Sequence, residues 1–213
     1  MCEPGCVYIG AVAESQIREA WDCGDMVAAL TRLLHAYGVE LQRYLFATTS
    51  GPTEAHDVYC ILAEDLWKGL PTFQWRCTAR AWAYTLARHA RARYVIAERR
   101  RISREDSLSG TPWLRQLVER TRTPTPMHER SEVVHGLRRL RDGLDELDRT
   151  LLMLRVDRGL SWKELAVVLD QVRPDEDPSS AATRLRQRFQ VVKRRLREMA
   201  VDAGLLEQEH DGR

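Results

Sequence analysis

The chain has 213 residues and a formal net charge of +2, and 44% of its residues are hydrophobic, which is enough to bury a core and excludes wholesale disorder. No apolar run approaches the roughly 20 residues that a membrane span needs, and no signal-peptide-like apolar stretch follows the N-terminus. We therefore expect a cytoplasmic protein without a membrane contact. Cys2 and Cys6 form a single C-x3-C and lack a second ligand pair, so we expect neither a metal site nor a cofactor.

Charge is distributed unevenly along the chain. Residues 14–70 carry nine acids against four bases, whereas residues 74–102 carry eight arginines against one acid. A second basic block, residues 184–197, has seven bases and no acid. Two separated basic blocks are typical of a protein that binds a polyanion such as nucleic acid, although solvated helix faces can carry the same charge.

The N-terminal half shows helical periodicity. Apolar residues recur at helical spacing over residues 25–46 and again over residues 53–69, and a Ser-Gly-Pro turn separates the two stretches. A loop over residues 72–77 follows, and Thr78 opens a long basic helix that we expect to end near Arg101. No convincing alternating strand pattern occurs anywhere, so the prediction is an all-α chain.

Periodicity fades between residues 103 and 130, where glycine, proline, serine and threonine are common, and it resumes at Ser131. We therefore expect two small helical domains joined by a flexible linker. The expected divisions are an N-terminal extension (1–21), a first domain (22–102), the linker (103–130), a second domain (131–199) and a tail (200–213).

The second domain contains a helix-turn-helix pattern. A helix over residues 144–159 ends at a glycine, and Ser161 and Glu164 then form a capping box at the start of a short helix. The last helix begins near residues 177–179 and continues to Met199. Its apolar residues form one stripe, and serine, threonine, glutamine and arginine occupy the opposite face, which suits a helix that enters the major groove of DNA.

These residues resemble the sigma-70 family of bacterial transcription factors. The sequences DRTLLMLR at 148–155 and GLSWKELA at 159–166 resemble sigma region 4, and EAHDV at 54–58, LWKGLPTF at 66–73 and RAWAYTLARH at 80–89 resemble region 2. The resemblance covers residues 22–102 and 131–199. Regions 1.1 and 3 have no counterpart, so the resemblance is to the small extracytoplasmic-function (ECF) type.

The resemblance implies that the chain is not an enzyme but binds core RNA polymerase, through its β and β′ subunits, and directs it to promoter DNA. An anti-sigma factor is a further partner that the resemblance allows. The helix over residues 53–68 is the expected polymerase contact, although a cysteine stands where the family usually has glutamine. The residues implied in this contact are Asp57, Cys60, Ile61 and Glu64.

The loop over residues 73–78 aligns with the family's loop that receives a flipped promoter base, and aromatic or polar walls suit such a base. The residues implied in binding and melting the −10 element are Phe73, Gln74, Trp75, Arg76, Arg80, Arg88 and Arg91. Core packing is the other interpretation of Phe73.

The last helix is implied in recognition of the −35 element. The residues assigned to this contact are Ser180, Thr183, Arg184, Gln187 and Arg188. The turn before it, residues 170–178, exceeds the usual three or four residues. It carries Asp175, Glu176 and Asp177, which are unfavourable near DNA phosphates unless they cap the helix.

Two other functions are compatible with a helix-turn-helix. A stand-alone transcriptional regulator would bind operators without polymerase, and it would have no need of the pattern at residues 66–73. An enzyme that acts on nucleic acid would need a carboxylate or histidine cluster, a glycine-rich phosphate loop or a nucleophile elbow, and none occurs in the sequence.

Overall fold

The computed structural model describes residues 4–109, 143–171 and 176–202, with side chains from residue 11 onward and, in the first range, up to residue 101. These residues form helices and the turns between them, and no strand occurs among them, which confirms the all-α prediction. The chain divides into two compact units, residues 1–125 and 126–213. Within the described ranges, no helix combines the length and the apolar character needed to cross a bilayer.

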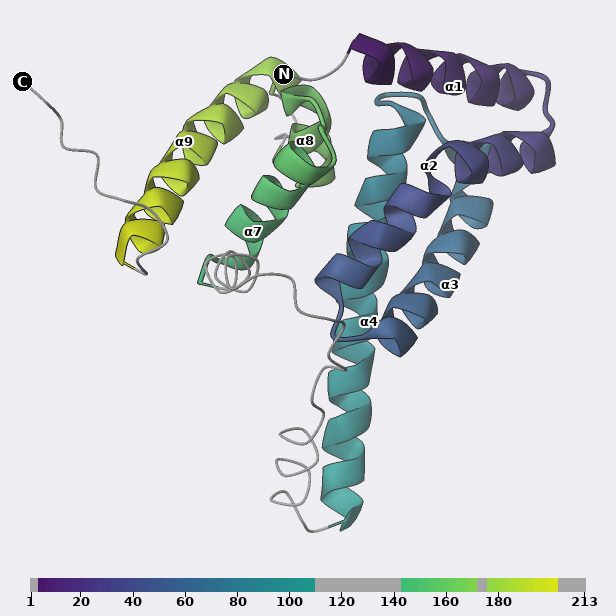
Figure 1. Cartoon of the computed structure of the whole chain (residues 1–213). Coiled ribbons are helices and arrows are strands. Elements are labelled where there is room, and N and C mark those ends of the chain that lie inside the picture. The colour runs from purple at the N-terminus through teal and green to yellow at the C-terminus, as the bar shows by residue number, and fades with distance from the viewer. Residues whose placement is uncertain (1–3, 110–142, 172–175, 203–213) are drawn as a thin grey trace, which may run out of the picture. The chain divides into compact units, whose positions relative to one another are not determined.

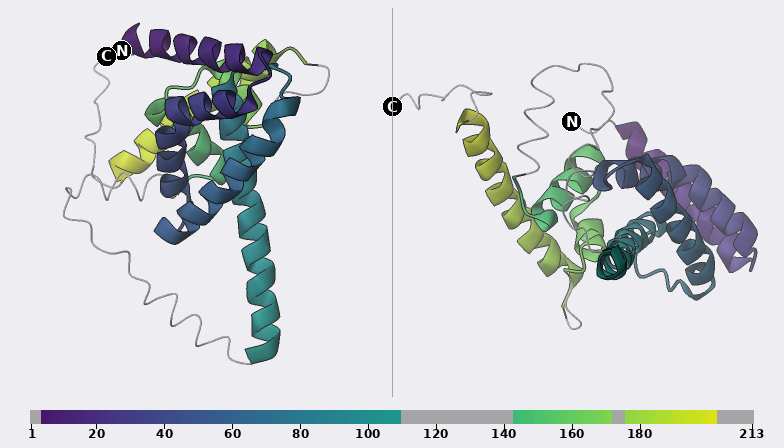
Figure 2. Two further views of the ribbon diagram at one scale, coloured as in Figure 1. Left: turned by 90° about the vertical axis from the view of Figure 1, so that its right-hand side faces the viewer. Right: turned by 90° about the horizontal axis from the view of Figure 1, so that it is seen from below.

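The described residues of the first unit form a bundle of four helices and one short 3-10 turn (Figure 1). Helix α2 contacts each of the other three helices, and α3 also packs along α4. The C-terminal part of α4 extends well past the ends of α2 and α3 (Figures 1 and 2). The elements are α1 (Pro4–Asp22), α2 (Met26–Thr48), α3 (Pro52–Gly69), η1 (Leu70–Thr72) and α4 (Ala79–Ser109).

Local sequence signals set the helix starts in this unit. Asp25 caps α2 by accepting a hydrogen bond of 2.9 Å from the Ala28 amide, and Pro52 begins α3 at a position that needs no amide donor. The tight turn between α1 and α2 depends on Gly24, which has a φ of +77°. The bundle then closes over fully buried side chains of three helices, among them Leu33, Leu41, Leu45, Val58, Leu62, Leu66 and Tyr84.

The sequence predicts residues 1–21 as an extension outside the first domain, whereas residues 4–22 form helix α1. Ile17 is fully buried and Ala20 nearly so, and α1 packs along α2. The indole Nε1 of Trp21 also donates a hydrogen bond of 2.7 Å to the Leu70 carbonyl. The apolar anchors are few and lie among exposed polar residues, so periodicity alone did not reveal a helix that belongs to the bundle.

Helix α4 is longer than predicted. It continues to Ser109 instead of ending near Arg101, so the first residues of the predicted linker (103–130) are helical. The rest of that segment, and residues 131–142 of the predicted second domain, lie outside the described residues.

The second unit contains the predicted helix-turn-helix elements. The helix predicted over residues 144–159 is present as α7 (Glu146–Leu152), which continues into the π-helical turn η2 (Met153–Asp157). Gly159 follows with a φ of +65°, as its predicted role at the helix end requires. The short helix α8 (Trp162–Val168) and the long helix α9 (Pro178–Asp202) follow and pack on each other.

Candidate nucleic-acid interface

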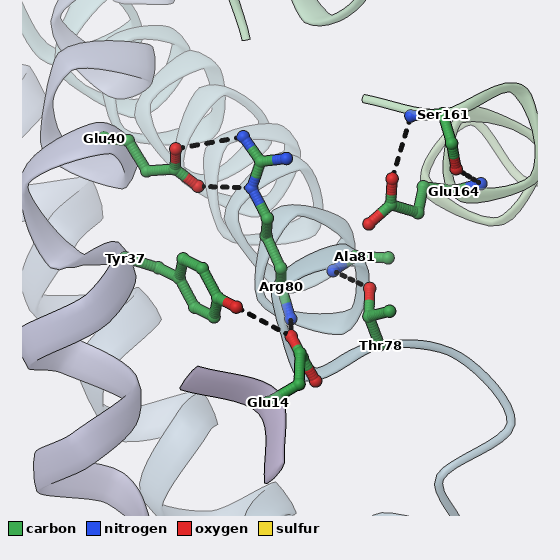
Figure 3. Close-up of polar contacts among 8 residues, drawn as sticks. All are labelled: Glu14, Tyr37, Glu40, Thr78, Arg80, Ala81, Ser161 and Glu164. Carbon is green, nitrogen blue, oxygen red and sulfur yellow. Dashed lines mark hydrogen bonds and ion pairs between the residues drawn. The ribbon is translucent and has the colours of Figure 1, made fainter. Parts of the chain in front are cut away.

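The predicted capping box fixes the start of α8. The Ser161 amide donates a hydrogen bond of 2.8 Å to Oε2 of Glu164, and the Glu164 amide donates one of 3.2 Å to Oγ of Ser161 (Figure 3). Each side chain thereby satisfies a backbone amide that the helix leaves without a partner. The prediction from the S-x-x-E spacing is confirmed.

Helix α9 has the two faces that its sequence predicts. Leu185, Phe189 and Val192 are buried against the rest of the unit. The opposite face is exposed and polar, and it includes Ser180, Thr183, Gln187, Gln190 and Arg194. Hydroxyl and amide groups of this kind can pair with the edges of bases in a major groove.

Arg188, which the resemblance implies at the −35 element, contacts carboxylates of its own unit. Its Nε donates to Oδ1 of Asp148, and its Nη2 donates to Oδ2 of Asp145 at 3.0 Å. The Asp148 residue is 8% exposed and is the one buried charged residue among the described residues. A buried carboxylate needs a hydrogen-bonded cation, so Arg188 is a tie between α9 and the start of α7. The adjacent charge of Arg188 also contributes to lowering the pKa of Asp145, after the larger effect of the hydrogen bond from the Asp148 amide.

Arg184 is also engaged within the unit. Both terminal nitrogens of its guanidinium bond to the carboxylate of Glu176, with Nη2 to Oε2 at 2.8 Å, and Nη2 donates to the Gln171 carbonyl at 2.9 Å. Glu176 belongs to the long acidic turn before α9. The sequence offered no signal for this pair, because the two residues are eight positions apart across a turn.

Two arginine side chains of the second unit lie over the ring of Trp162 in α8. The guanidinium carbon of Arg155 lies 4.5 Å from the centre of the indole, and that of Arg186 lies 5.7 Å from it. The indole also meets Phe189 edge to face at 5.4 Å. Stacking on an aromatic ring holds a guanidinium in place, and Nη1 of Arg155 also donates a hydrogen bond of 2.6 Å to the Leu160 carbonyl.

In the first unit, the loop predicted to receive a base is held by an aromatic cluster. Phe73 is buried and stacks on Trp82 at 4.6 Å, which supports core packing as the interpretation of Phe73. Trp75 contacts Phe73 at 4.8 Å and Trp21 at 6.0 Å, and the Arg18 guanidinium lies over its ring. The exposed side chains of this loop are those of Gln74 and Arg76.

Trp75 has two unusual features. Its φ is +55°, a strained value for a bulky residue, and its indole Nε1 is buried without a hydrogen-bond partner among the described residues. Both features are costly, and such outliers concentrate at functional sites. These two features make the loop a candidate functional site. Nothing in the sequence predicted the strain.

The arginines of α4 differ in how accessible they are. Arg80 forms a two-bond ion pair with Glu40 of α2, with Nε to Oε1 at 2.7 Å and Nη2 to Oε2 at 3.0 Å (Figure 3). Its side chain is 21% exposed, so its structural role is to tie α4 to α2. Arg88 and Arg91 are partly buried. The exposed Arg93 forms an ion pair with Asp65 of α3.

The N-terminus of α4 is capped from a distant helix. The Ala79 amide donates a hydrogen bond of 2.8 Å to the carboxylate of Glu14. The Arg80 amide and the Tyr37 hydroxyl each donate one of 3.0 Å to the same carboxylate (Figure 3). Burial, followed by the charge of Glu14, raises the pKa of Tyr37. Glu14 was not identified from the sequence, because a cap 65 residues away has no local spacing.

The predicted polymerase-contact residues share one side of α3. Asp57, Cys60 and Glu64 are exposed, and Ile61 is partly buried. No motif in the sequence marks Trp67 as a further member of this surface. Trp67 is 48% exposed and lies seven residues after Cys60, which places both on the same side of the helix.

No group of metal-ligating side chains occurs within the described ranges. The five cysteines include three whose side chains are described, Cys23, Cys60 and Cys77, and these three are thiols without a disulfide. No family model, curated protein or solved structure matches the chain.

Proposed function

We propose that this protein is a promoter-specificity factor of the sigma-70 type, in the small two-domain ECF form, and is not an enzyme. The observation that carries the proposal is the exposed polar face of α9, which follows a capped short helix and a turn. This arrangement is the helix-turn-helix expected of a −35 reader, and it accompanies the sequence patterns of sigma regions 2 and 4.

Recognition of the −35 element is assigned to the neutral polar residues of α9. Ser180, Thr183 and Gln187 are exposed at helical spacing, so they face the same groove. Arg188 serves this function indirectly, because it holds the recognition helix against α7. Each base contact by such a side chain contributes about 1–3 kcal/mol of discrimination.

The first unit supplies the polymerase contact and the −10 contact. The surface of α3 that carries Asp57, Cys60 and Glu64, with Trp67 beside it, is suited to a basic helix of core RNA polymerase, since it joins carboxylates to an exposed aromatic ring. Gln74 and Arg76 are the exposed loop residues that are best placed to contact separated strands. The protein works in the cytoplasm, where polymerase and promoters are found.

The alternative is a stand-alone helix-turn-helix regulator. The second unit favours this alternative, because a helix-turn-helix can bind DNA without polymerase. It leaves the exposed surface of α3 and the strained Trp75 loop of the first unit without a role.

Run-off transcription with purified core polymerase tests the proposal. We expect the full chain to direct transcripts from a subset of genomic fragments, and tight DNA binding without any directed transcript would favour the regulator instead.

Trp75→Ala should impair promoter opening, measured by permanganate reactivity, while leaving polymerase binding intact. An equal loss of both activities would show that Trp75 has a structural role only.

Gln187→Ala provides a test of the −35 assignment. The variant should alter the preference among upstream elements by about 5-fold to 160-fold in relative affinity, as expected for a lost base contact of about 1–3 kcal/mol. Gln190→Ala, on the same face one turn later, tests whether the base readout extends along the helix. If the two variants prefer the same upstream elements as the unmodified chain, base readout lies elsewhere.

A further inference from the structure

The acidic turn before α9 supplies a carboxylate to the recognition helix. Glu176 is 14% exposed at its side chain, although it lies in a surface turn, because its carboxylate folds onto Arg184. The Gln171 carbonyl, at the other end of the turn, accepts a further hydrogen bond from the same guanidinium. Gln171 and Glu176 therefore both bond to one arginine of α9.

Arg184 is placed where DNA would otherwise bind it. It lies four residues after Ser180 and three before Gln187, so it is adjacent to the exposed polar residues on the helix surface. An arginine there would ordinarily pair with a phosphate through two parallel hydrogen bonds. The two oxygens of Glu176 occupy the same fork and present the same geometry as a phosphate.

We propose that Glu176 is an internal competitor of DNA phosphate for Arg184. On this proposal, which rests on the proposed DNA-binding function, the turn weakens sequence-independent attraction to DNA. Discrimination is thereby left to the neutral side chains of Ser180, Thr183 and Gln187. The acids that are unfavourable near DNA phosphates thus act as a determinant of specificity.

The charge of Asp177 provides a matched control. Asp177 is exposed and adjacent to Glu176, and its side chain has no ion pair among the described residues. Its backbone carbonyl accepts the Ser180 amide at 2.9 Å, a contact that asparagine preserves. Glu176→Gln and Asp177→Asn therefore each remove one negative charge from the same turn, but only Glu176→Gln releases Arg184.

The experiment measures binding of the full chain to a fluorescein-labelled duplex of random sequence by anisotropy, over a series of salt concentrations. We expect Glu176→Gln to bind about threefold to fivefold more tightly than Asp177→Asn, the range that breaking an exposed ion pair allows. The slope of log affinity against log salt should steepen by about 0.9 in Glu176→Gln, one additional phosphate contact, and stay unchanged in Asp177→Asn. Equal affinities for the two variants, or weaker binding by Glu176→Gln, would overturn the proposal.

A double-mutant cycle with Arg184→Ala isolates the pair. In the Arg184→Ala background, Glu176→Gln should lose its advantage over Asp177→Asn, because no guanidinium remains to be released. An advantage that persists would also refute the mechanism. Transcription is not part of this readout, so a chain that passes here but fails in the run-off assay would contradict the sigma function and leave the competition for Arg184 standing.

Discussion

Replacement of Glu14 by alanine tests whether α1 is an integral part of the first unit. The carboxylate accepts hydrogen bonds from the Ala79 and Arg80 amides and from the Tyr37 hydroxyl. Hydrogen bonds to a charged group contribute about 1.5–3 kcal/mol each, and loss of a helix N-cap alone costs about 1 kcal/mol. Because water can reach part of the site and the contributions overlap, we expect Glu14→Ala to lower the free energy of unfolding by about 3 kcal/mol.

Urea denaturation followed by far-ultraviolet circular dichroism measures this loss. Glu14→Gln should lose less than Glu14→Ala, because the amide oxygen can still accept one of the backbone bonds. Glu19→Ala, on the same helix, is the control: its side chain is 72% exposed and its contact with Arg32 is 3.4 Å long, so the expected change is under about 1 kcal/mol. If Glu14→Ala and Glu19→Ala destabilise the chain equally, the inferred cap does not contribute as argued.

Three further changes follow from contacts within single units. Gly69→Ala places a Cβ atom 2.9 Å from Cζ2 of Trp82. We therefore expect urea denaturation to show a free energy of unfolding lower by about 1–3 kcal/mol, and the near-ultraviolet circular dichroism spectrum to change. An unchanged spectrum would contradict the close approach. Arg188→Ala should lower the free energy of unfolding by about 2–3 kcal/mol, because it leaves the buried Asp148 without its cation. The double variant Arg188→Ala/Asp148→Ala should recover part of that loss in the same assay. The pKa of Asp145 is lowered in the folded chain, so its stabilisation is present above about pH 4 and is lost as the pH falls through the folded value. Hydrogen exchange at the start of α7 should therefore differ between the unmodified chain and Asp145→Asn near neutral pH and converge in acid.

Features with local spacing could be predicted from the sequence. The starts of α2, α3, α8 and α9, the capping box of Ser161 and Glu164 and the two faces of α9 depend on residues within about one or two helical turns. Periodicity and capping patterns detect such relations. The structure confirms these features. It also places the predicted −35 residues Ser180, Thr183 and Gln187 on one exposed surface.

Contacts between distant segments could not be predicted in this way. Arg80 pairs with Glu40 and Arg188 with Asp148, each 40 positions apart, and a composition count treats all four as charges available to solvent. The sequence shows that an arginine lies on a basic helix, but not which carboxylate the fold brings to it. The same limitation concealed Glu14, whose partners belong to a helix that begins 65 residues later.

The ion pairs of the arginines reduce the positive charge that this protein can offer to an anionic partner. Arg80, Arg93, Arg184 and Arg188 are each matched by a carboxylate of the same unit. The effective valence of the two basic blocks is therefore smaller than the formal count of their arginines. If the protein binds DNA as proposed, a low effective valence lets it dissociate readily from random DNA at physiological ionic strength, and its residence on a promoter would depend on shape and base contacts more than on bulk attraction.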